Sequence, residues 1–109
     1  MTVFNIPIRT ISEANNRDHW SKKARRAKGQ RLMARLLTLS NLSKKLERYV
    51  VTLTRIGKRK LDTDNLARSM KAIRDGIADA IGVDDGDERL RWEYEQKIGK
   101  SYFVEVSIK

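Results

Sequence analysis

The chain of 109 residues predicts a single domain over 1–109, and its 24 Lys and Arg against 14 Asp and Glu give a formal net charge of +10. Such an excess favours a polyanionic partner, with nucleic acid preferred over an acidic membrane surface. Cysteine is absent, which excludes disulfides and thiolate metal sites and favours a reducing compartment. We expect no signal peptide and no membrane-spanning segment, and hence a cytoplasmic protein.

Strands and helices alternate in the first half of the chain. Residues 3–8 predict a short strand, in which Pro7 favours an edge position. Residues 18–39 have a helical composition rich in Ala, Lys, Arg and Leu, although Gly29 suggests a kink or a break. Residues 48–56 are rich in β-branched side chains and predict a second strand.

The second half begins with the clearest element, a helix over 64–81 that Gly82 ends. Its apolar face repeats at steps of three and four, at Leu66, Met70, Ile73, Ile77 and Ile81. Residues 89–98 and 102–108 alternate like strands, and Gly99 between them suggests a hairpin turn. The predicted order is β-α-β-α-β-β, a small α/β (α+β) domain with a mixed sheet and two main helices.

Two acidic clusters, 62–65 and 84–87, lie at the two ends of the helix over 64–81. In an extended segment Asp62 and Asp64 face the same side, so they could bind one Mg²⁺, which prefers oxygen ligands. A straight helix of this length would hold the two clusters roughly 25 Å apart. Either the loop after the helix folds back, or the clusters meet across a dimer.

A stripe of charged residues on this helix gives a second indication of chemistry. Asp64, Arg68, Lys71 and Asp75 follow at i, i+4, i+7 and i+11, opposite the apolar face. A cation near a carboxylate pair suits a phosphate substrate because it stabilises developing negative charge. The alternative is ordinary structure: an Asp that caps the helix, a surface ion pair between Lys71 and Asp75, and a solvated turn at 84–87.

The run Asp62-Thr63-Asp64-Asn65-Leu66, followed by a helix and then Val83-Asp84-Asp85, resembles the RusA family of Holliday-junction resolvases, in particular its branch in phages and prophages. The residues at 15–17 and the basic helix after them are also similar, so the resemblance covers essentially the whole chain. It implies a RusA-like fold, a homodimer in the cytoplasm of a bacterial host, and an endonuclease that uses Mg²⁺, with Mn²⁺ as a substitute.

The resemblance also implies which residues act. Asp62, Asp64 and Asp85 would be the metal ligands and catalytic carboxylates, with Asp84 and Asn65 as further members of the site.

A catalytic cation is implied as well. The family pattern has a Lys one helical turn after the second Asp, but this chain has Arg68 there, and Lys71 follows a turn later. We name both as catalytic candidates and prefer Lys71.

Two basic groups predict contacts to DNA phosphates. The first lies on the helix over 18–39 and the second directly precedes the first acidic cluster. The candidates are Lys22, Lys23, Arg25, Arg26 and Lys28 on the helix, followed by Arg31, and Lys58, Arg59 and Lys60 before the aspartates. No pattern for base reading accompanies them, so we expect recognition of DNA shape and backbone. The alternative for the helical group is a solvated surface.

These observations lead to a hypothesis of a structure-selective endodeoxyribonuclease that resolves four-way junctions by paired nicks in recombination and repair. One alternative is a non-catalytic, basic DNA-binding protein of phage origin, which would bind DNA without metal-dependent cutting. A second alternative is a structural or regulatory phage protein, which would lack strong, salt-dependent affinity for DNA.

Overall fold

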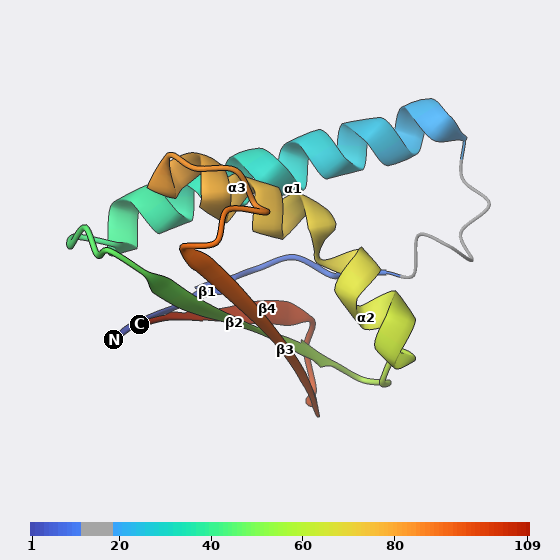
Figure 1. Ribbon diagram of the computed structural model, residues 1–109. Helices are drawn as coiled ribbons and strands as arrows, with labels where there is room; N and C mark the ends of the chain where they lie inside the picture. Colours follow the sequence, from blue (N-terminus) through green and yellow to red (C-terminus); the bar gives the residue numbers. More distant parts are fainter. Residues whose placement is uncertain (12–18) are drawn as a thin grey trace.

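The computed structural model of the protein describes residues 1–11 and 19–109 (Figure 1). The motif at 15–17 and the predicted helix start at Asp18 lie outside the described residues. The elements are β1 (Thr2–Ile6), α1 (Trp20–Asn41), β2 (Tyr49–Gly57), α2 (Thr63–Ser69), α3 (Lys71–Ile81), β3 (Leu90–Ile98) and β4 (Phe103–Ile108). The predicted α+β class and element order are confirmed, except that the second helix is divided in two.

The four strands form one mixed sheet in the order β1-β4-β2-β3. β3 pairs with β2 in parallel, whereas β4 pairs antiparallel with both β2 and β1. The hairpin predicted at Gly99 is therefore wrong, because β2 lies between β3 and β4. The crossover through α2 and α3 returns β3 to one side of β2, which leaves only the other side for β4. β1 lies at an edge, as predicted, and it ends just before Pro7.

The helices cover one face of the sheet and the core lies between the two layers (Figure 1). The strand residues that face the helices are apolar and buried, as period-two alternation requires. They include Phe4, Ile6, Val51, Leu53, Val104, Val106 and Ile108. From α2 and α3, Leu66, Ile73 and Ile77 are buried against them, as is Met70 between the two helices. The apolar face predicted for 64–81 is thus confirmed.

Met70 separates α2 from α3, where a single helix over 64–81 was expected. Its backbone leaves helical geometry at φ −98° and ψ 0°, and its N–H donates to the Ala67 carbonyl at 3.2 Å. The Ser69 hydroxyl donates to the Leu66 carbonyl at 2.7 Å, a bond that bends helices. Gly82 then ends α3 in the left-handed conformation, at φ 91°, as predicted.

α1 runs without a break through Gly29, so the expected kink is absent. It crosses α3 closely at Gly76, where a Cβ atom would overlap the carbonyl oxygen of Arg31 and lie 2.8 Å from the Cβ of Ala34. Arg31 also binds Asp79 on α3 through two hydrogen bonds, of 2.6 and 2.9 Å. The two helices are therefore fixed to each other at this crossing.

The outer face of α1 carries three leucines, Leu32, Leu36 and Leu39, that are each more than half exposed. They follow at i, i+4 and i+7 and form one apolar stripe, which we call the leucine stripe. No helix within 1–11 and 19–109 is both long and apolar enough to cross a membrane.

Candidate functional site

The helix-facing side of β3 holds both acidic segments in place. The indole N–H of Trp92 donates to the Asp85 carbonyl at 2.8 Å. Four residues further along the strand, the side-chain amide of Gln96 exchanges two hydrogen bonds with the backbone of Leu61, of 2.9 and 2.8 Å. The segment before α2 and the loop after α3 are thus attached to one strand, about 13 Å apart at the strand's rise per residue.

Arg74 on α3 fixes the loop after Gly82 from the other side. Its guanidinium lies over the Trp92 ring, 5.0 Å from the centroid, and donates to the Tyr94 hydroxyl at 3.0 Å. It also donates to the Asp85 carbonyl at 3.2 Å. Its Nε lies 3.1 Å from the Asp85 carboxylate but makes no hydrogen bond, so this contact is an ion pair only. The loop therefore folds back over α3, but this does not bring the two acidic clusters together within the described residues of the subunit.

Lys71 joins the folded-back loop to the charged stripe. Its ammonium donates to Asp75 Oδ1 and to Asp85 Oδ2, both at 2.8 Å. These hydrogen bonds raise the pKa of Lys71, mainly through Asp75, and the bond from Lys71 lowers the pKa of the Asp85 carboxyl. Lys71 and Asp85 therefore both stay charged at neutral pH. The ion pair of Lys71 and Asp75 was expected from helical spacing; the contact with Asp85 was not.

The other catalytic candidate, Arg68, is exposed and makes no ion pair with any described residue. It lines a hollow of about 370 Å³ between the helices and β3, together with Ala67, Lys71, Arg74 and Tyr94. Both candidate cations thus face the same hollow, but only Lys71 contacts a candidate carboxylate.

Asp62 and Asp64 lie at the start of α2, and both side chains are exposed. Asp62 is the N-cap residue, with extended backbone at φ −61° and ψ 152°, but its carboxylate makes no capping hydrogen bond. A purely structural capping role therefore does not account for Asp62. Asn65, which follows in the motif, is half-buried.

The three aspartates of the predicted metal site do not meet in one cluster. Within the part of the chain that the structure describes, no three or more His, Asp or Glu side chains are grouped closely enough to hold a metal ion. Mg²⁺ commonly uses only one or two carboxylates, with water and substrate phosphate as its other ligands. Asp62 and Asp64 are both exposed, but α2 begins at Thr63, so Asp64 is helical and the extended segment expected to place both carboxylates on one side is not present. Their role as a pair of Mg²⁺ ligands stays a prediction. The inclusion of Asp85 stays a prediction.

The second acidic cluster divides into groups with different surroundings. Asp84 is exposed, and its carbonyl accepts a hydrogen bond of 3.0 Å from the backbone of Asp87. The Arg89 guanidinium and backbone N–H bind the Asp87 carboxylate and lower its pKa to about 2. Both residues therefore belong to a turn, as the structural alternative predicted, whereas Asp85 points to Lys71.

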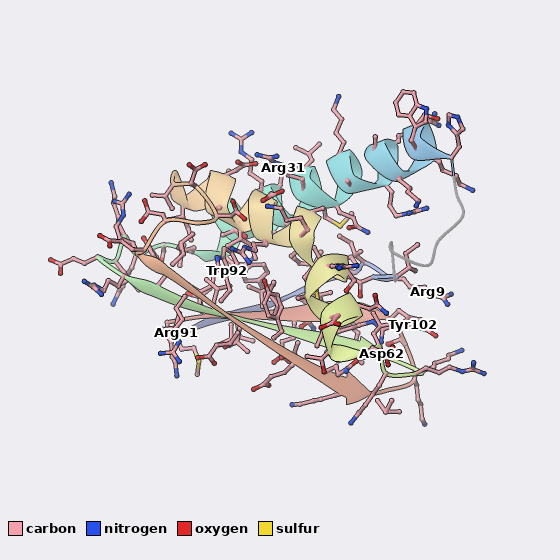
Figure 2. The ribbon with its side chains drawn as sticks, turned by 45° about the vertical axis from the view of Figure 1, so that its right-hand side comes forward. Arg9, Arg31, Asp62, Arg91, Trp92 and Tyr102 are labelled. Carbon is pink, nitrogen blue, oxygen red and sulfur yellow. The ribbon has the colours of Figure 1, made fainter. Side chains whose placement is uncertain are left out.

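Cationic side chains gather where three strands end and β4 begins, beside Asp62 (Figure 2). We call this surface the basic end. It comprises Arg9 after β1, Lys58, Arg59 and Lys60 after β2, Lys97 at the end of β3, and Lys100 before β4. The second predicted basic group thus lies on a larger surface. Three further cations were missed because they are scattered in the sequence, and only the strand order brings them together.

Arg55 and Tyr102 organise the loops of the basic end from within. The Arg9 guanidinium lies over the Tyr102 ring at 4.3 Å (Figure 2), and Arg55 approaches the same ring at 5.8 Å. Arg55 is buried and donates to the Thr10 hydroxyl at 3.1 Å and to the Arg59 carbonyl at 2.6 Å. Burial lowers the pKa of Arg55. A buried guanidinium therefore ties two loops together beneath the exposed cations.

The first basic group lies on the N-terminal half of α1, the part of that helix that extends beyond the sheet (Figure 1). Lys22, Arg25 and Lys28 are exposed, whereas Lys23 and Arg26 are half-buried. Arg31, which follows them, is bound by Asp79.

Comparison with known proteins gives no assignment, since no family model, no curated protein and no solved structure matches this chain.

Proposed function

We propose that the protein is a Mg²⁺-dependent, structure-selective endodeoxyribonuclease that resolves four-way DNA junctions by paired nicks, as the resemblance to the RusA family implies. The observation that carries the proposal is the folded-back loop, which brings Asp85 against Lys71, one of the two candidate cations that line the hollow between the helices and β3. The same resemblance suggests action in the cytoplasm of a bacterial host, with a phage or prophage origin.

Each charged group has a part in this proposal. Asp62 and Asp64 would hold Mg²⁺, with Mn²⁺ as a substitute, and the ion would supply an activated water and neutralise phosphate charge. Lys71 would stabilise the negative charge that develops on the phosphate, since its raised pKa keeps it protonated. Arg74 and Trp92 restrain Asp85 through hydrogen bonds to its backbone carbonyl.

The charge distribution supports DNA as the partner. The basic end flanks Asp62, and the cations of α1 lie on the helix that extends beyond the sheet. Cations at both places would neutralise phosphates on either side of the cleavage point, and binding would weaken steeply with salt. Contacts of this kind recognise backbone shape and suit a branched substrate.

Paired nicks require two active sites, so the proposal includes a homodimer. The leucine stripe on α1 supports it, because three leucines on one exposed helix face form an apolar patch that a second copy would cover.

Replacing Leu36 with lysine is expected to convert the dimer into monomers and to leave the fold intact, because Leu36 is exposed in the subunit. Sedimentation equilibrium of the wild type, L36K and the control N41K would measure this, since Asn41 is also exposed on α1 but lies away from the leucine stripe. A wild-type protein that sediments as a monomer, or an L36K dimer of unchanged stability, would contradict the proposed interface.

The direct test of the proposed function is cleavage of a labelled four-way junction, with and without Mg²⁺, beside a linear duplex. The wild type is expected to cut the junction only with Mg²⁺, and D64N is expected to lose ~100-fold or more of the rate. E95Q is the matched control, because Glu95 is an exposed carboxylate on β3 whose neighbours Tyr94 and Gln96 face the helices. Unchanged cleavage by D64N would rule the assignment out.

One observation favours the second candidate, a DNA-binding protein without catalysis: the three candidate aspartates do not form one cluster within the described residues of a subunit. That candidate predicts tight binding to the junction and no cutting at any Mg²⁺ concentration, so the same experiment separates the two.

A further inference from the structure

A pocket of about 490 Å³ lies between the N-terminal half of α1 and the junction of α2 and α3. Its volume is in the range of pockets that bind small organic groups. Three alanines give it an apolar surface: Ala24 and Ala27 from α1, and Ala72 from α3. Because alanine has no side chain beyond Cβ, the two helices leave an open space here that larger residues would fill.

The rim of this alanine pocket is cationic. Lys28 from α1 and Arg68 and Lys71 from the other helices line it, and Asp75 is the acidic residue among the lining side chains. Asp75 is bound by Lys71, so its charge is already balanced. An apolar floor with a cationic rim complements a group that is flat and apolar at one end and anionic at the other, which describes a nucleotide.

Trp20 extends the same surface outward. It lies one helical turn before Ala24 and two turns before Ala27, and its side chain is 73% exposed. Trp20 does not line the pocket, but an exposed indole one helical turn beyond it offers a ring on which a neighbouring base can stack.

The alanine pocket is adjacent to the hollow of the proposed nuclease site. Arg68 and Lys71 line both the pocket and the hollow next to Tyr94. A base in the pocket would therefore place its own phosphates near the two candidate catalytic cations.

We propose that the alanine pocket receives one unpaired DNA base next to the phosphate that is cut, with its phosphates on Lys28 and Arg68. This inference rests on the proposed action on DNA. It adds the feature of the DNA that the protein would recognise, which is an unstacked nucleotide at a branch or bulge. Such a nucleotide has already lost its pairing, so entry into the pocket costs little unstacking energy.

The test measures binding without metal, in EDTA, so that it does not depend on cleavage. Three labelled duplexes are compared by fluorescence anisotropy: one fully paired, one with a single bulged nucleotide, and one with an abasic residue at the same bulge. The abasic duplex keeps the bend and the phosphates and lacks only the base. We expect the wild type to bind the base-containing bulge roughly tenfold more tightly than the abasic one, from apolar burial of the base.

A27F is expected to abolish this preference, because the phenyl ring fills the pocket, while affinity for the paired duplex stays within about twofold of the wild type. N41F is the control, with the same ring on an exposed position at the other end of α1 and away from the leucine stripe. Equal binding of the base-containing and abasic bulges by the wild type would overturn the proposal, as would a preference that A27F retains.

These outcomes are separate from those of the nuclease test. A preference for the base-containing bulge in a protein that never cuts DNA would support the pocket and refute the nuclease. Junction cleavage by a wild type that binds both bulges equally would refute the pocket alone.

Discussion

Replacement of Lys71 with methionine is expected to lower the rate of junction cleavage at saturating DNA by ~100-fold or more, the usual cost of removing one group that stabilises developing charge. Of the two candidate cations, Lys71 is the one that contacts a candidate carboxylate: its ammonium nitrogen lies 2.8 Å from Asp85 Oδ2. Methionine keeps most of the length of the side chain and removes the charge. A lower cleavage rate would therefore be due to loss of the ammonium group itself.

Arg68 provides the matched comparison because it lines the same hollow and makes no ion pair with a described residue. R68M is expected to weaken DNA binding and to leave the rate at saturation within a few-fold of the wild type. Single-turnover kinetics over a range of protein concentrations separate the two effects. The opposite result would contradict this prediction. If R68M lowered the cleavage rate at saturating DNA and K71M lowered only the affinity for DNA, Arg68 would be the catalytic cation.

Replacement of Gly76 with alanine is expected to destabilise the fold by about 1–3 kcal/mol, the range for added atoms in a packed interior. The new Cβ would overlap the Arg31 carbonyl, which belongs to the backbone of α1 and cannot rotate away. Alanine is the better helix former by about 1 kcal/mol, so a net loss would mean that the helix crossing outweighs propensity.

Gly29 is the matched control, since it lies within α1 and a Cβ there would meet nothing within 4 Å. G29A is expected to gain about 0.5–1 kcal/mol. Urea unfolding followed by circular dichroism measures both variants. A G76A protein as stable as G29A would show that α1 and α3 are not held as closely as described.

The hydrophobic periodicity of each segment was sufficient to predict most of the helices and strands, because it can be read from the residues of that segment alone. The apolar face over Leu66, Met70, Ile73 and Ile77 and the alternation in the strands both follow from which side meets the core. The break at Met70 was not predictable in this way, since it arises from a buried side chain and a serine hydroxyl without Gly or Pro.

The pairing of strands required information that no local pattern contains. Gly99 between two strands is a sound indication of a hairpin, but it does not reveal that β3 has already taken its place beside β2. The parallel crossover decided the outcome, and it depends on α2 and α3 as a unit.

The sequence was sufficient to predict the residue types of the candidate site, but only part of their spatial arrangement. Helical spacing was enough to expect Lys71 beside Asp75. The contact between Lys71 and Asp85 depends on Arg74 and Trp92, which hold the loop through its backbone carbonyl and carry no sequence motif. The cations Arg9, Lys97 and Lys100 join the basic end through strand order alone.

The position of β4 between β1 and β2 has a consequence for biosynthesis. β4 comes after the other three strands of this sheet in the chain, yet β1 and one edge of β2 depend on it for their hydrogen bonds. A nascent chain on the ribosome therefore holds β1 without any partner and β2 with one open edge until residue 108 has emerged. Open strand edges invite pairing with other chains. Correct assembly of this sheet is accordingly a late event, completed only after synthesis of β4.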